Sequence, residues 1–449
     1  MNKLKPITFK FEKGILSLLV GAVCFQRSLT ASDWRQFRGP DNSGVSLQSL
    51  APSHWSDTNH LAWTRQIPGY GWSSPIVVGD KIIVTTAVCD NQKRPDPSFS
   101  LRMFGNGKPP DAVYRWEIFC MDRNTGKTLW SKVALERKPT IALTSGNTYA
   151  SETPVSDGVC VYAYFGMQGV YCYDLEGKEV WQRDLGAYKI LMNWGTGSSP
   201  ALEAGRLFIL CDNDEKSFLV ALDSKTGKDL WRVTRDERSN WATPFVWRNQ
   251  VRTEIVTAGG KGIRSYNPAD GKVLWELKRE AGAQMTYVTA TPVANQKMLY
   301  VGAGSHSPLW AVKAGASGDI SLQAGDARNA GIAWSNFKAG PPMSSPLLYK
   351  DYLYVVMQNG ILMCLDAESG KEIYRERLKG AHSFTASPWA QDGKLYCLDE
   401  DGRTFVIEAG PNFVVQGKNE IKDFFWSTPA LSGDALYLRG ANRLYCIKQ

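Results

Sequence analysis

The chain has 449 residues and a formal net charge of +8, with 41 Gly, 22 Pro, 16 Trp, 18 Tyr and 17 Phe spread along its length. This composition suits many short strands joined by turns, and it argues against a helical or a disordered protein. No block of like charges marks a nucleic-acid partner.

The first 31 residues have the pattern of a secretory signal peptide. A basic start (Lys3, Lys5, Lys10 and Lys13) precedes an apolar run over residues 14–25, and the small residue Ala31 precedes the expected cut at Ser32. The run is shorter than the roughly 20 residues of a membrane helix, so we expect no transmembrane span, with a retained interfacial anchor as the alternative. Val23 fits a lipobox poorly, so we do not expect lipid anchoring at Cys24. Cleavage would lower the net charge to about +4 and leave a periplasmic or secreted protein.

After a lead-in segment (residues 32–59), the chain repeats one unit of four strands. Each unit begins with small or polar residues and a proline; these prolines are Pro75, Pro154, Pro200, Pro244, Pro292, Pro346, Pro388 and Pro429. After a first spacing of 79 residues, the spacings lie between 41 and 54. This period, with four strands in each unit, predicts the blades of a β-propeller.

Most units then contain a D-x-x-T-G-K turn and a strand that ends in an aromatic residue. Residues 120–130, 221–231, 265–275 and 364–374 share one spacing, and residues 172–181 are one residue shorter. Asp or Asn initiates such a turn, and Gly supplies the positive φ that closes it. We expect the terminal aromatic side chains to pack against the neighbouring blade: Trp63, Trp130, Trp181, Trp231, Trp275 and Tyr374.

The two ends of the chain are expected to complete one blade. Residues 424–449 supply three strands, and residues 60–68, which include Trp63, supply the missing outer strand. Such closure removes the exposed sheet edges of an open array. The sequence therefore predicts an all-β, eight-bladed propeller over residues 60–449, with four antiparallel strands in each blade and the ring closed by N- and C-terminal strands.

Three regions depart from the repeat. Blade five has Leu322 in the terminal slot, with residues 332–334 as an alternative outer strand, and blade seven (residues 404–418) lacks the turn motif and the Trp. Both fit the drift that is usual in propellers. Blade one carries an insertion, residues 89–116, which is rich in Pro, Gly and charge. We expect it to be a surface loop, and loops of this length are often functional.

Nine cysteines in an exported chain raise the question of disulfides. One repeat position holds a cysteine in four blades: Cys120, Cys172, Cys364 and Cys446. Copies of one position face their own blade interfaces rather than each other, so we expect small buried thiols. No Cys-Cys pair and no C-x-x-C occurs, and the four histidines are scattered. We therefore predict neither a metal site nor a catalytic residue.

The repeat A-x-D-x-x-T-G-x-x-x-W resembles the tryptophan-docking motif of the PQQ-like, quinoprotein-type β-propeller family, over essentially the whole chain after the signal peptide. That family includes quinoprotein dehydrogenases and non-enzymatic BamB-like propellers. Residues 33–46, 147–166 and 194–200 look like those of PQQ-repeat proteins abundant in planctomycete-type bacteria. The resemblance implies the fold strongly and a function only weakly, because one fold hosts many unrelated sites.

The resemblance leaves a PQQ- and calcium-dependent alcohol or sugar dehydrogenase as an alternative function. Such an enzyme needs a flat slot for the quinone, Glu, Asn and Asp oxygens for Ca²⁺, and a carboxylate base. Carboxylates that could lie near strand ends are Glu152, Asp212, Asp214 and Asp236. The Cys-Cys pair that stacks on the quinone in the family's enzymes is missing here, so we expect no cofactor, neither PQQ nor Ca²⁺.

Aromatic residues recur just before the blade prolines, where the chain enters the innermost strand beside the channel mouth. Together with polar residues of converging loops they form the candidate binding face: Trp72, Tyr149, Asn193, Trp194, Asp212, Asn213, Arg235, Trp241 and Trp426. The aromatic side chains either plug the channel rim or form a recognition surface. From the propeller pattern and the missing Cys-Cys pair we predict a monomeric, non-catalytic scaffold for envelope proteins or an extracellular ligand. A carbohydrate-binding propeller is a further alternative.

Overall fold

The computed structural model describes Met1 and residues 33–96, 107–279, 287–304 and 307–449. The chain divides into two units, Met1–Thr30 and Ala31–Gln449. Apart from Met1, the predicted signal peptide lies outside the described residues, and so does Cys24. Within the described ranges, no helix combines the length and the hydropathy that a membrane crossing requires.

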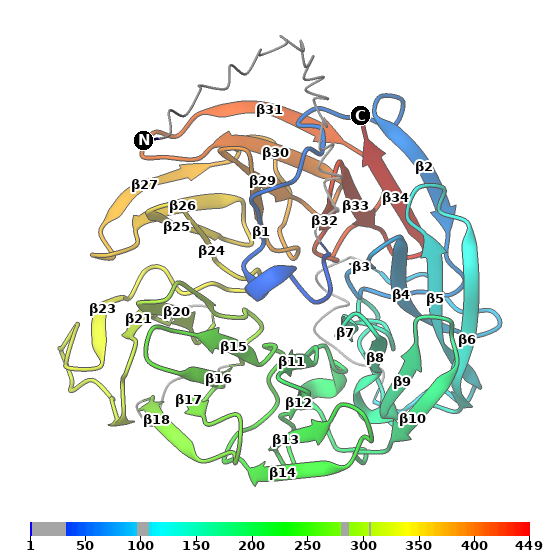
Figure 1. Cartoon of the computed structure of the whole chain (residues 1–449), viewed down its shortest axis with the longest axis horizontal. Coiled ribbons are helices and arrows are strands. Elements are labelled where there is room, and N and C mark those ends of the chain that lie inside the picture. Colours follow the sequence, from blue (N-terminus) through cyan, green and yellow to red (C-terminus); the bar gives the residue numbers. More distant parts are fainter. Residues whose placement is uncertain (2–32, 97–106, 280–286, 305–306) are drawn as a thin grey trace. The chain divides into compact units, whose positions relative to one another are not determined.

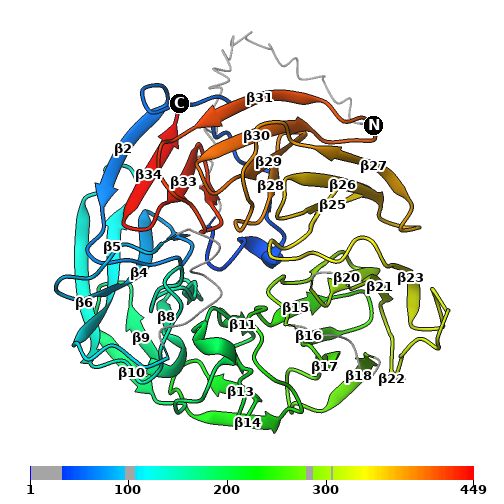
Figure 2. The same cartoon turned by 180° about the vertical axis from the view of Figure 1, so that it is seen from behind.

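The second unit is an all-β propeller of eight blades, as the sequence predicts (Figure 1). Each blade is an antiparallel sheet of four strands, with the first strand next to the central channel and the last at the rim (Figure 2). Blades one to four contain β3–β6 (Ile76–Val78, Lys81–Val88, Tyr114–Asp122, Thr128–Arg137), β7–β10 (Val155–Ser156, Cys160–Tyr164, Val170–Asp174, Glu179–Arg183), β11–β14 (Ala201–Glu203, Arg206–Cys211, Phe218–Asp223, Asp229–Thr234) and β15–β18 (Phe245–Arg248, Thr253–Ala258, Gly262–Tyr266, Val273–Lys278).

The second half of the ring follows the same plan. Blades five to eight contain β19–β21 with β23 (Val293–Ala294, Met298–Gly302, Leu309–Lys313, Ile332–Asn336), β24–β27 (Leu347–Tyr349, Tyr352–Val356, Ile361–Asp366, Glu372–Arg377), β28–β31 (Trp389–Gln391, Lys394–Leu398, Arg403–Glu408, Val415–Glu420) and β32–β34 with β2 (Ala430–Ser432, Ala435–Arg439, Arg443–Lys448, Leu61–Gln66). Short elements complete the described chain: β1 (Val45–Ser46), β22 (Gly318–Asp319), η1 (Pro40–Asn42), η2 (Gly166–Gln168) and η3 (Leu191–Asn193).

The ring closes as predicted, through a blade made from both ends of the chain. Strand β2 pairs antiparallel with β34, and Trp63 lies opposite Cys446. In blade five the alternative prediction is confirmed: β23 is the outer strand, and Trp334 holds the terminal slot opposite Ala311. Leu322 lies outside the strands, because the preceding segment leaves its own blade as β22 and pairs in parallel with β18 of blade four.

The outer tryptophans dock on the next blade. The indole N–H of Trp130 donates to the carbonyl of Leu175 at 2.9 Å, and that of Trp181 donates to the carbonyl of Ser224 at 2.9 Å. Each accepting residue directly follows the Asp that starts the next turn. Gly227, at φ 68°, closes one of these turns, and a Cβ there would lie 2.5 Å from the Trp181 ring. The glycine therefore serves both the turn and the flat contact with the indole.

Trp275 departs from this docking pattern. It is fully buried, but its indole N–H donates to the Glu254 carboxylate of its own blade at 2.7 Å. Blade five has no D-x-x-T-G turn to receive it, since the sequence after β21 is Ala314-Gly315-Ala316. Trp275 is thus buried as the sequence predicts, but it donates to a carboxylate of its own blade rather than to a carbonyl of the next blade.

The lead-in segment crosses the blades at one end of the channel. Trp34 forms an antiparallel bridge with Val77 of blade one, and β1 pairs in parallel with β28 of blade seven. Between them, a guanidinium nitrogen of Arg38 donates to the carbonyl of Pro346 in blade six at 2.7 Å. The blue segment with η1 accordingly lies near the middle of the ring in Figure 1. Residues 33–46 are thus part of the propeller rather than a free arm.

The predicted insertion is shorter than expected, and six of the eight described cysteines are buried. Strand β5 begins at Tyr114, so residues 114–116 belong to blade one, and Trp116 is fully buried. Residues 97–106 lie outside the described residues. All eight described cysteines are free, and the four at the shared repeat position are buried.

Candidate functional site

The channel wall is built by the residues just before the eight blade prolines. The residue immediately before each proline is a serine or a threonine: Ser74, Thr153, Ser199, Thr243, Thr291, Ser345, Ser387 and Thr428. Side chains alternate between the two faces of extended chain, so this residue and the one two positions earlier face the same way. The eight Ser and Thr residues, together with the eight residues two positions before them, all line one cavity on the channel axis. We call the eight hydroxyl residues the hydroxyl ring.

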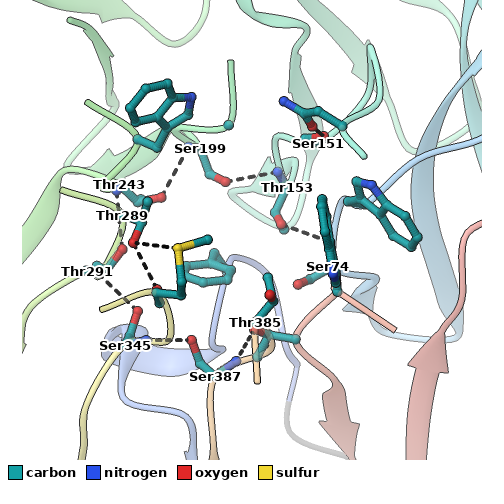
Figure 3. A pocket seen from close by; sticks show the side chains of 18 of the residues that line it. Ser74, Ser151, Thr153, Ser199, Thr243, Thr289, Thr291, Ser345, Thr385 and Ser387 are labelled. Carbon is teal, nitrogen blue, oxygen red and sulfur yellow. Dashed lines mark hydrogen bonds between the residues drawn. The ribbon is translucent and has the colours of Figure 1, made fainter. Parts of the chain in front are cut away.

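The hydroxyl ring is held in place from blade to blade (Figure 3). The backbone N–H of Ser199 donates to the Thr243 hydroxyl at 3.1 Å, and that of Thr243 donates to the Thr291 hydroxyl at 3.2 Å. Seven bonds of this kind, of 2.9 to 3.2 Å, join successive blades from Ser74 round to Thr428. In each of them the hydroxyl oxygen accepts, so its own proton remains available. The bonds therefore fix the positions of seven of the eight oxygens, and among the described residues no partner takes up their O–H protons.

The residues two positions earlier form a second ring at the channel mouth, which we call the mouth ring: Trp72, Ser151, Gly197, Trp241, Thr289, Met343, Thr385 and Trp426. Trp72 and Trp426, from neighbouring blades one and eight, have ring centroids 5.3 Å apart. Trp241 packs against Trp194 at 5.6 Å and against Tyr287 at 5.6 Å. These two aromatic groups lie on opposite sides of the channel, since blade four is four blades away from blade eight.

Two of the three tryptophans of the mouth ring are oriented by an indole hydrogen bond. The indole N–H of Trp72 donates to the carbonyl of Gly146 at 2.9 Å, and that of Trp241 donates to the carbonyl of Gly195 at 2.7 Å. Gly146 lies in the loop between blades one and two, and Gly195 lies in the loop between blades two and three. Each tryptophan is therefore bonded to a loop beside the inner strand of a neighbouring blade. A ring held by one directional bond presents the same face to the cavity at all times, which lowers the entropic cost of binding against it.

The lead-in segment supplies the far end of the cavity. Phe37 lines the same space as the hydroxyl ring, and its neighbours Trp34 and Arg38 are the residues that bridge to blades one and six. The cavity holds about 300 Å³. That volume lies at the lower end of the range of roughly 300–1,000 Å³ that is usual for small-molecule sites. Among the described residues, the lead-in segment therefore bounds the channel cavity at the end away from the mouth, through Phe37.

The described cavity wall carries no formal charge. Thirteen of its 23 described residues are Ser or Thr, six are aromatic, and Asn147, Gln358, Met343 and Gly197 complete the set. Among these described residues there is no Asp, Glu, Lys, Arg or His. In the described ranges of the chain, no group of three or more His, Cys, Asp and Glu side chains is arranged to hold a metal ion. The wall can offer hydroxyl groups and aromatic faces, but no counter-ion.

One carboxyl group lies just behind this wall. Glu152 precedes Thr153 of the hydroxyl ring and points to the opposite face of the strand, where it is buried. Its Oε1 atom has no hydrogen-bond partner. Burial raises the pKa of Glu152 to about 7, and a contact with the Thr196 hydroxyl lowers it in part. A Cβ at Gly166 would lie 2.8 Å from that Oε1 atom, so the glycine makes room for the carboxyl group.

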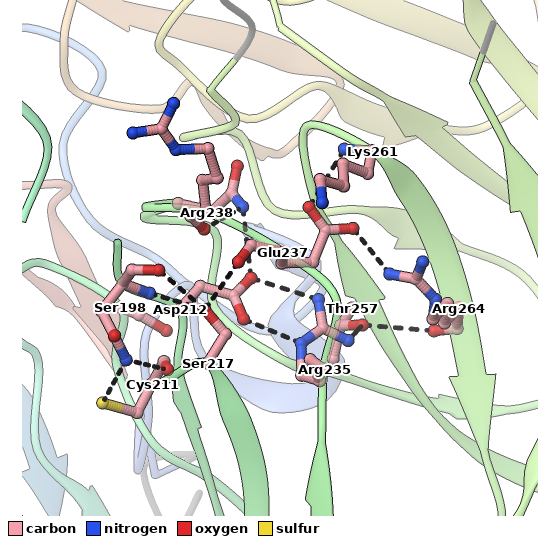
Figure 4. A network of polar contacts seen from close by, with 12 residues as sticks. Ser198, Cys211, Asp212, Ser217, Arg235, Glu237, Arg238, Thr257, Lys261 and Arg264 are labelled. Atoms are coloured by element: carbon pink, nitrogen blue, oxygen red, sulfur yellow. Dashed lines mark hydrogen bonds and ion pairs between the residues drawn. The ribbon is translucent and has the colours of Figure 1, made fainter. Parts of the chain in front are cut away.

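Asp212 and Arg235 of the candidate face belong to a separate, buried network between blades three and four (Figure 4). Arg235 donates from Nε to Oδ1 of Asp212 at 2.8 Å and from a terminal nitrogen to Oδ2 at 3.1 Å. Both side chains are fully buried. Burial alone would lower the pKa of Arg235, but the charge of Asp212 and further hydrogen-bond partners raise it above its ordinary value. This ion pair is a structural link, not a free binding group.

The structure places the other predicted residues as follows. Trp72, Trp194, Trp241 and Trp426 line the cavity together. Tyr149 is in the core between blades one and two, where its hydroxyl donates to the carbonyl of Ile141 at 2.7 Å.

Two asparagines of the candidate face are also away from the cavity wall. Asn213 closes the turn after β12, accepting the backbone N–H of Lys216 and donating to its carbonyl at 2.8 Å. Asn193, at φ 56°, ends η3 and does not line the cavity. Of the acids weighed as cofactor ligands, Asp236 is exposed and pairs with Lys261, and Asp214 pairs with Arg238.

Comparisons with known proteins agree with this architecture. The family model described as outer membrane protein assembly factor BamB matches residues 166–314 and 307–410. The BamB of Moranella endobia is 23% identical over 301 residues, which cover 65% of this chain and 73% of that protein. The solved structure of BamB from Moraxella catarrhalis has a TM-score of 0.57 at 10% identity, covering 87% of this chain and 99% of that one. Quinohemoprotein alcohol dehydrogenase from Comamonas testosteroni has a TM-score of 0.61 at 11% identity, covering 92% and 80%.

Proposed function

Because the chain belongs to the BamB-like family of PQQ-type β-propellers, we propose that it is an exported, non-catalytic scaffold of the cell envelope that binds its partner or ligand at the channel mouth. Relatives of this family are named as factors in outer membrane protein assembly. The observation that carries the absence of catalysis in this proposal is the uncharged described wall of the channel cavity.

The dehydrogenase alternative needs residues that the described cavity wall does not offer. PQQ is an anionic quinone with three carboxylates, and its Ca²⁺ takes carboxylate and amide oxygens from the protein. The wall has neither a cation to pair with the quinone carboxylates nor a carboxylate to bind Ca²⁺. Glu152 is buried and is not among the residues that line the cavity, and Asp212 is already paired with Arg235. We therefore propose that the pocket does not hold PQQ and Ca²⁺.

The test of non-catalysis is a reconstitution. Purified protein is incubated with PQQ and Ca²⁺, then assayed for dye-linked oxidation of alcohols and sugars, for retained quinone absorbance and for a change in Tm. A quinohemoprotein alcohol dehydrogenase treated in parallel is the positive control. We expect no turnover, no retained quinone and an unchanged Tm. Oxidation above the protein-free background would overturn the proposal.

Export and partner binding have their own tests. Expression of the full chain in a Gram-negative host, followed by fractionation and mass spectrometry, should find a mature chain that begins at Ser32 in the periplasmic fraction. Photo-crosslinkers at exposed positions beside the channel mouth should capture an envelope protein, whereas the same crosslinker at an exposed rim position such as Leu129 should not. A full-length chain that stays in the cytoplasm would contradict export.

A further inference from the structure

We propose that the channel cavity binds a neutral saccharide, whose sugar ring lies between the two aromatic groups and whose hydroxyls bond to the hydroxyl ring. This inference rests on the proposed function, because it assigns a ligand class to the channel mouth of the scaffold. It goes beyond that function by naming the chemistry that the pocket recognises.

The first argument is the supply of hydrogen-bonding groups. All eight residues of the hydroxyl ring line the cavity, and seven of their hydroxyl oxygens accept a backbone N–H of the preceding blade, while no described hydrogen bond uses their protons. The side-chain amide of Gln358, which also lines the cavity, takes part in no described hydrogen bond. A ligand that fills this space must satisfy many donors and acceptors on all sides, since unpaired buried polar groups are costly. Sugars carry hydroxyls on most of their carbons and meet this demand.

The second argument is the placement of the aromatic faces. The C–H groups on one face of a pyranose ring form an apolar surface that packs against an aromatic ring, whose face is electron-rich. Trp241, with Trp194 and Tyr287, offers such a surface on one side of the channel, and Trp72 with Trp426 offers one on the other. The indole N–H bonds to loop carbonyls hold these faces ready before a ligand arrives. Aromatic faces around a hydroxyl-lined floor match the two kinds of surface on a sugar.

The third argument is the lack of charge. An anionic or cationic ligand would leave water for a space in which no described side chain carries the opposite charge, and burying an unpaired ion costs far more than burying a hydroxyl. The cavity volume of about 300 Å³ suits the end of a saccharide rather than a folded protein segment. The ligand that fits this cavity is therefore neutral, compact and rich in hydroxyl groups, and an uncharged sugar has these three properties.

The experiment is a tryptophan-fluorescence and calorimetric titration of the full protein. The probes are glucose, N-acetylglucosamine, maltose and cellobiose, with glucuronate as the anionic match to glucose. We expect saturable binding of at least one neutral probe with a Kd of about 1 mM or tighter. Glucuronate should bind at least about tenfold more weakly than glucose, because its carboxylate finds no counter-ion. No saturable binding by any neutral probe, or equal binding of glucose and glucuronate, would overturn the inference.

A set of tryptophan variants separates binding from folding. Trp241→Ala should weaken binding of the best probe by at least about tenfold, and Trp241→Phe, which keeps an aromatic face, should retain most of it. Trp231→Ala is the matched control, because Trp231 is also half-buried and also donates its indole N–H to a backbone carbonyl, that of Pro268 at 3.0 Å. Its binding should equal that of the wild type even if its Tm falls. Equal loss in Trp231→Ala and Trp241→Ala would show a general folding effect and would contradict the assigned site.

The outcomes distinguish this inference from the proposed function. If the saccharides fail but crosslinking at the channel mouth still captures an envelope protein, only the ligand class is wrong. If dye-linked oxidation of a bound sugar is observed, the non-catalytic scaffold is wrong and the saccharide site is correct.

Discussion

The tryptophans of the outer strands and those of the channel mouth look alike locally, yet they follow different rules along the chain. Trp181 and Trp241 each donate an indole N–H to a backbone carbonyl, at 2.9 Å and 2.7 Å. The outer position is aromatic in seven of the eight blades, with Gly417 in blade seven, and in five of these blades the aromatic ring meets the glycine of the next turn. The mouth position holds Trp in three blades and Ser, Gly, Thr or Met in the others.

This difference separates the residues that close the ring from those that shape the pocket. A position that docks a blade on its neighbour has the same task around the ring, so the repeat keeps an aromatic side chain there in every blade but the seventh. A position that faces the channel has no such task, and its side chain can differ from blade to blade. Repetition therefore indicates packing, and broken repetition on the inner wall indicates the site.

The largest expected effect is loss of an outer tryptophan. Trp181→Ala should lower the free energy of unfolding by about 3–5 kcal/mol, because a buried indole is replaced by a cavity and its hydrogen bond to Ser224 is lost. Urea denaturation measures it. Val180→Ala, on the same strand but exposed, is the control and should change stability by no more than about 0.5 kcal/mol. A loss below about 1 kcal/mol for Trp181→Ala would refute the docking role.

Glu152 should make stability depend on pH. Its folded pKa of about 7 lies above the ordinary value of 4.5, so the folded state binds the proton more tightly. Its effect on stability is therefore absent below about pH 4.5, develops as a loss between pH 4.5 and 7, and is complete above pH 7. Glu152→Gln should stabilise the protein above pH 7 by up to about 3 kcal/mol and change little at pH 4.5. Equal pH profiles for the wild type and the variant, from urea unfolding, would exclude a buried titrating carboxyl.

The hydroxyl ring should contribute an intermediate amount. Thr243→Val keeps the shape of the side chain but removes the acceptor for the backbone N–H of Ser199, so we expect a loss of about 1–3 kcal/mol. Thr234→Val is the control, because Thr234 is exposed on β14 and its side chain has no described hydrogen bond. Differential scanning calorimetry of the two variants tests the pair. The same Tm for both would mean that the ring does not join the blades.

Much of the fold could be predicted because the four-strand unit and its proline occur eight times along the chain. The proline period and the turn motif give the blades, and the missing last strand leads directly to the pairing of Trp63 with Cys446. Blade five could be given only as two alternatives. Its outer slot belongs to Trp334 rather than Leu322 because β22 pairs with another blade, and a parallel pairing with blade four leaves no periodic trace in the sequence.

The candidate site was predictable in its aromatic residues and not in its polar ones. Position relative to the proline singles out Trp72, Trp241 and Trp426, and the structure places all three in the cavity wall. The position immediately before the proline would have indicated the hydroxyl ring as well, since a Ser or Thr precedes every blade proline. Asp212 and Arg235 were misleading, because two charged residues near strand ends look like free loop groups until the fold pairs them. Phe37 comes from the lead-in segment, and only a long-range contact brings it to the cavity.

The smallest expected effect decides between the two interpretations of the mouth aromatics. Trp181→Phe and Trp241→Phe each remove one indole N–H and keep an aromatic ring. In Trp181→Phe the carbonyl of Ser224 loses its donor in a buried place that water does not reach, so we expect the free energy of unfolding to fall by about 1–1.5 kcal/mol. Beside the open cavity, water can replace the lost donor, so Trp241→Phe should cost only about 0.5 kcal/mol. If urea unfolding reverses this order, the mouth tryptophans serve to plug the channel rim. If Trp181→Phe costs more than Trp241→Phe, the indole N–H of Trp241 contributes little to the stability of the propeller. That result favours the interpretation of the mouth tryptophans as a recognition surface.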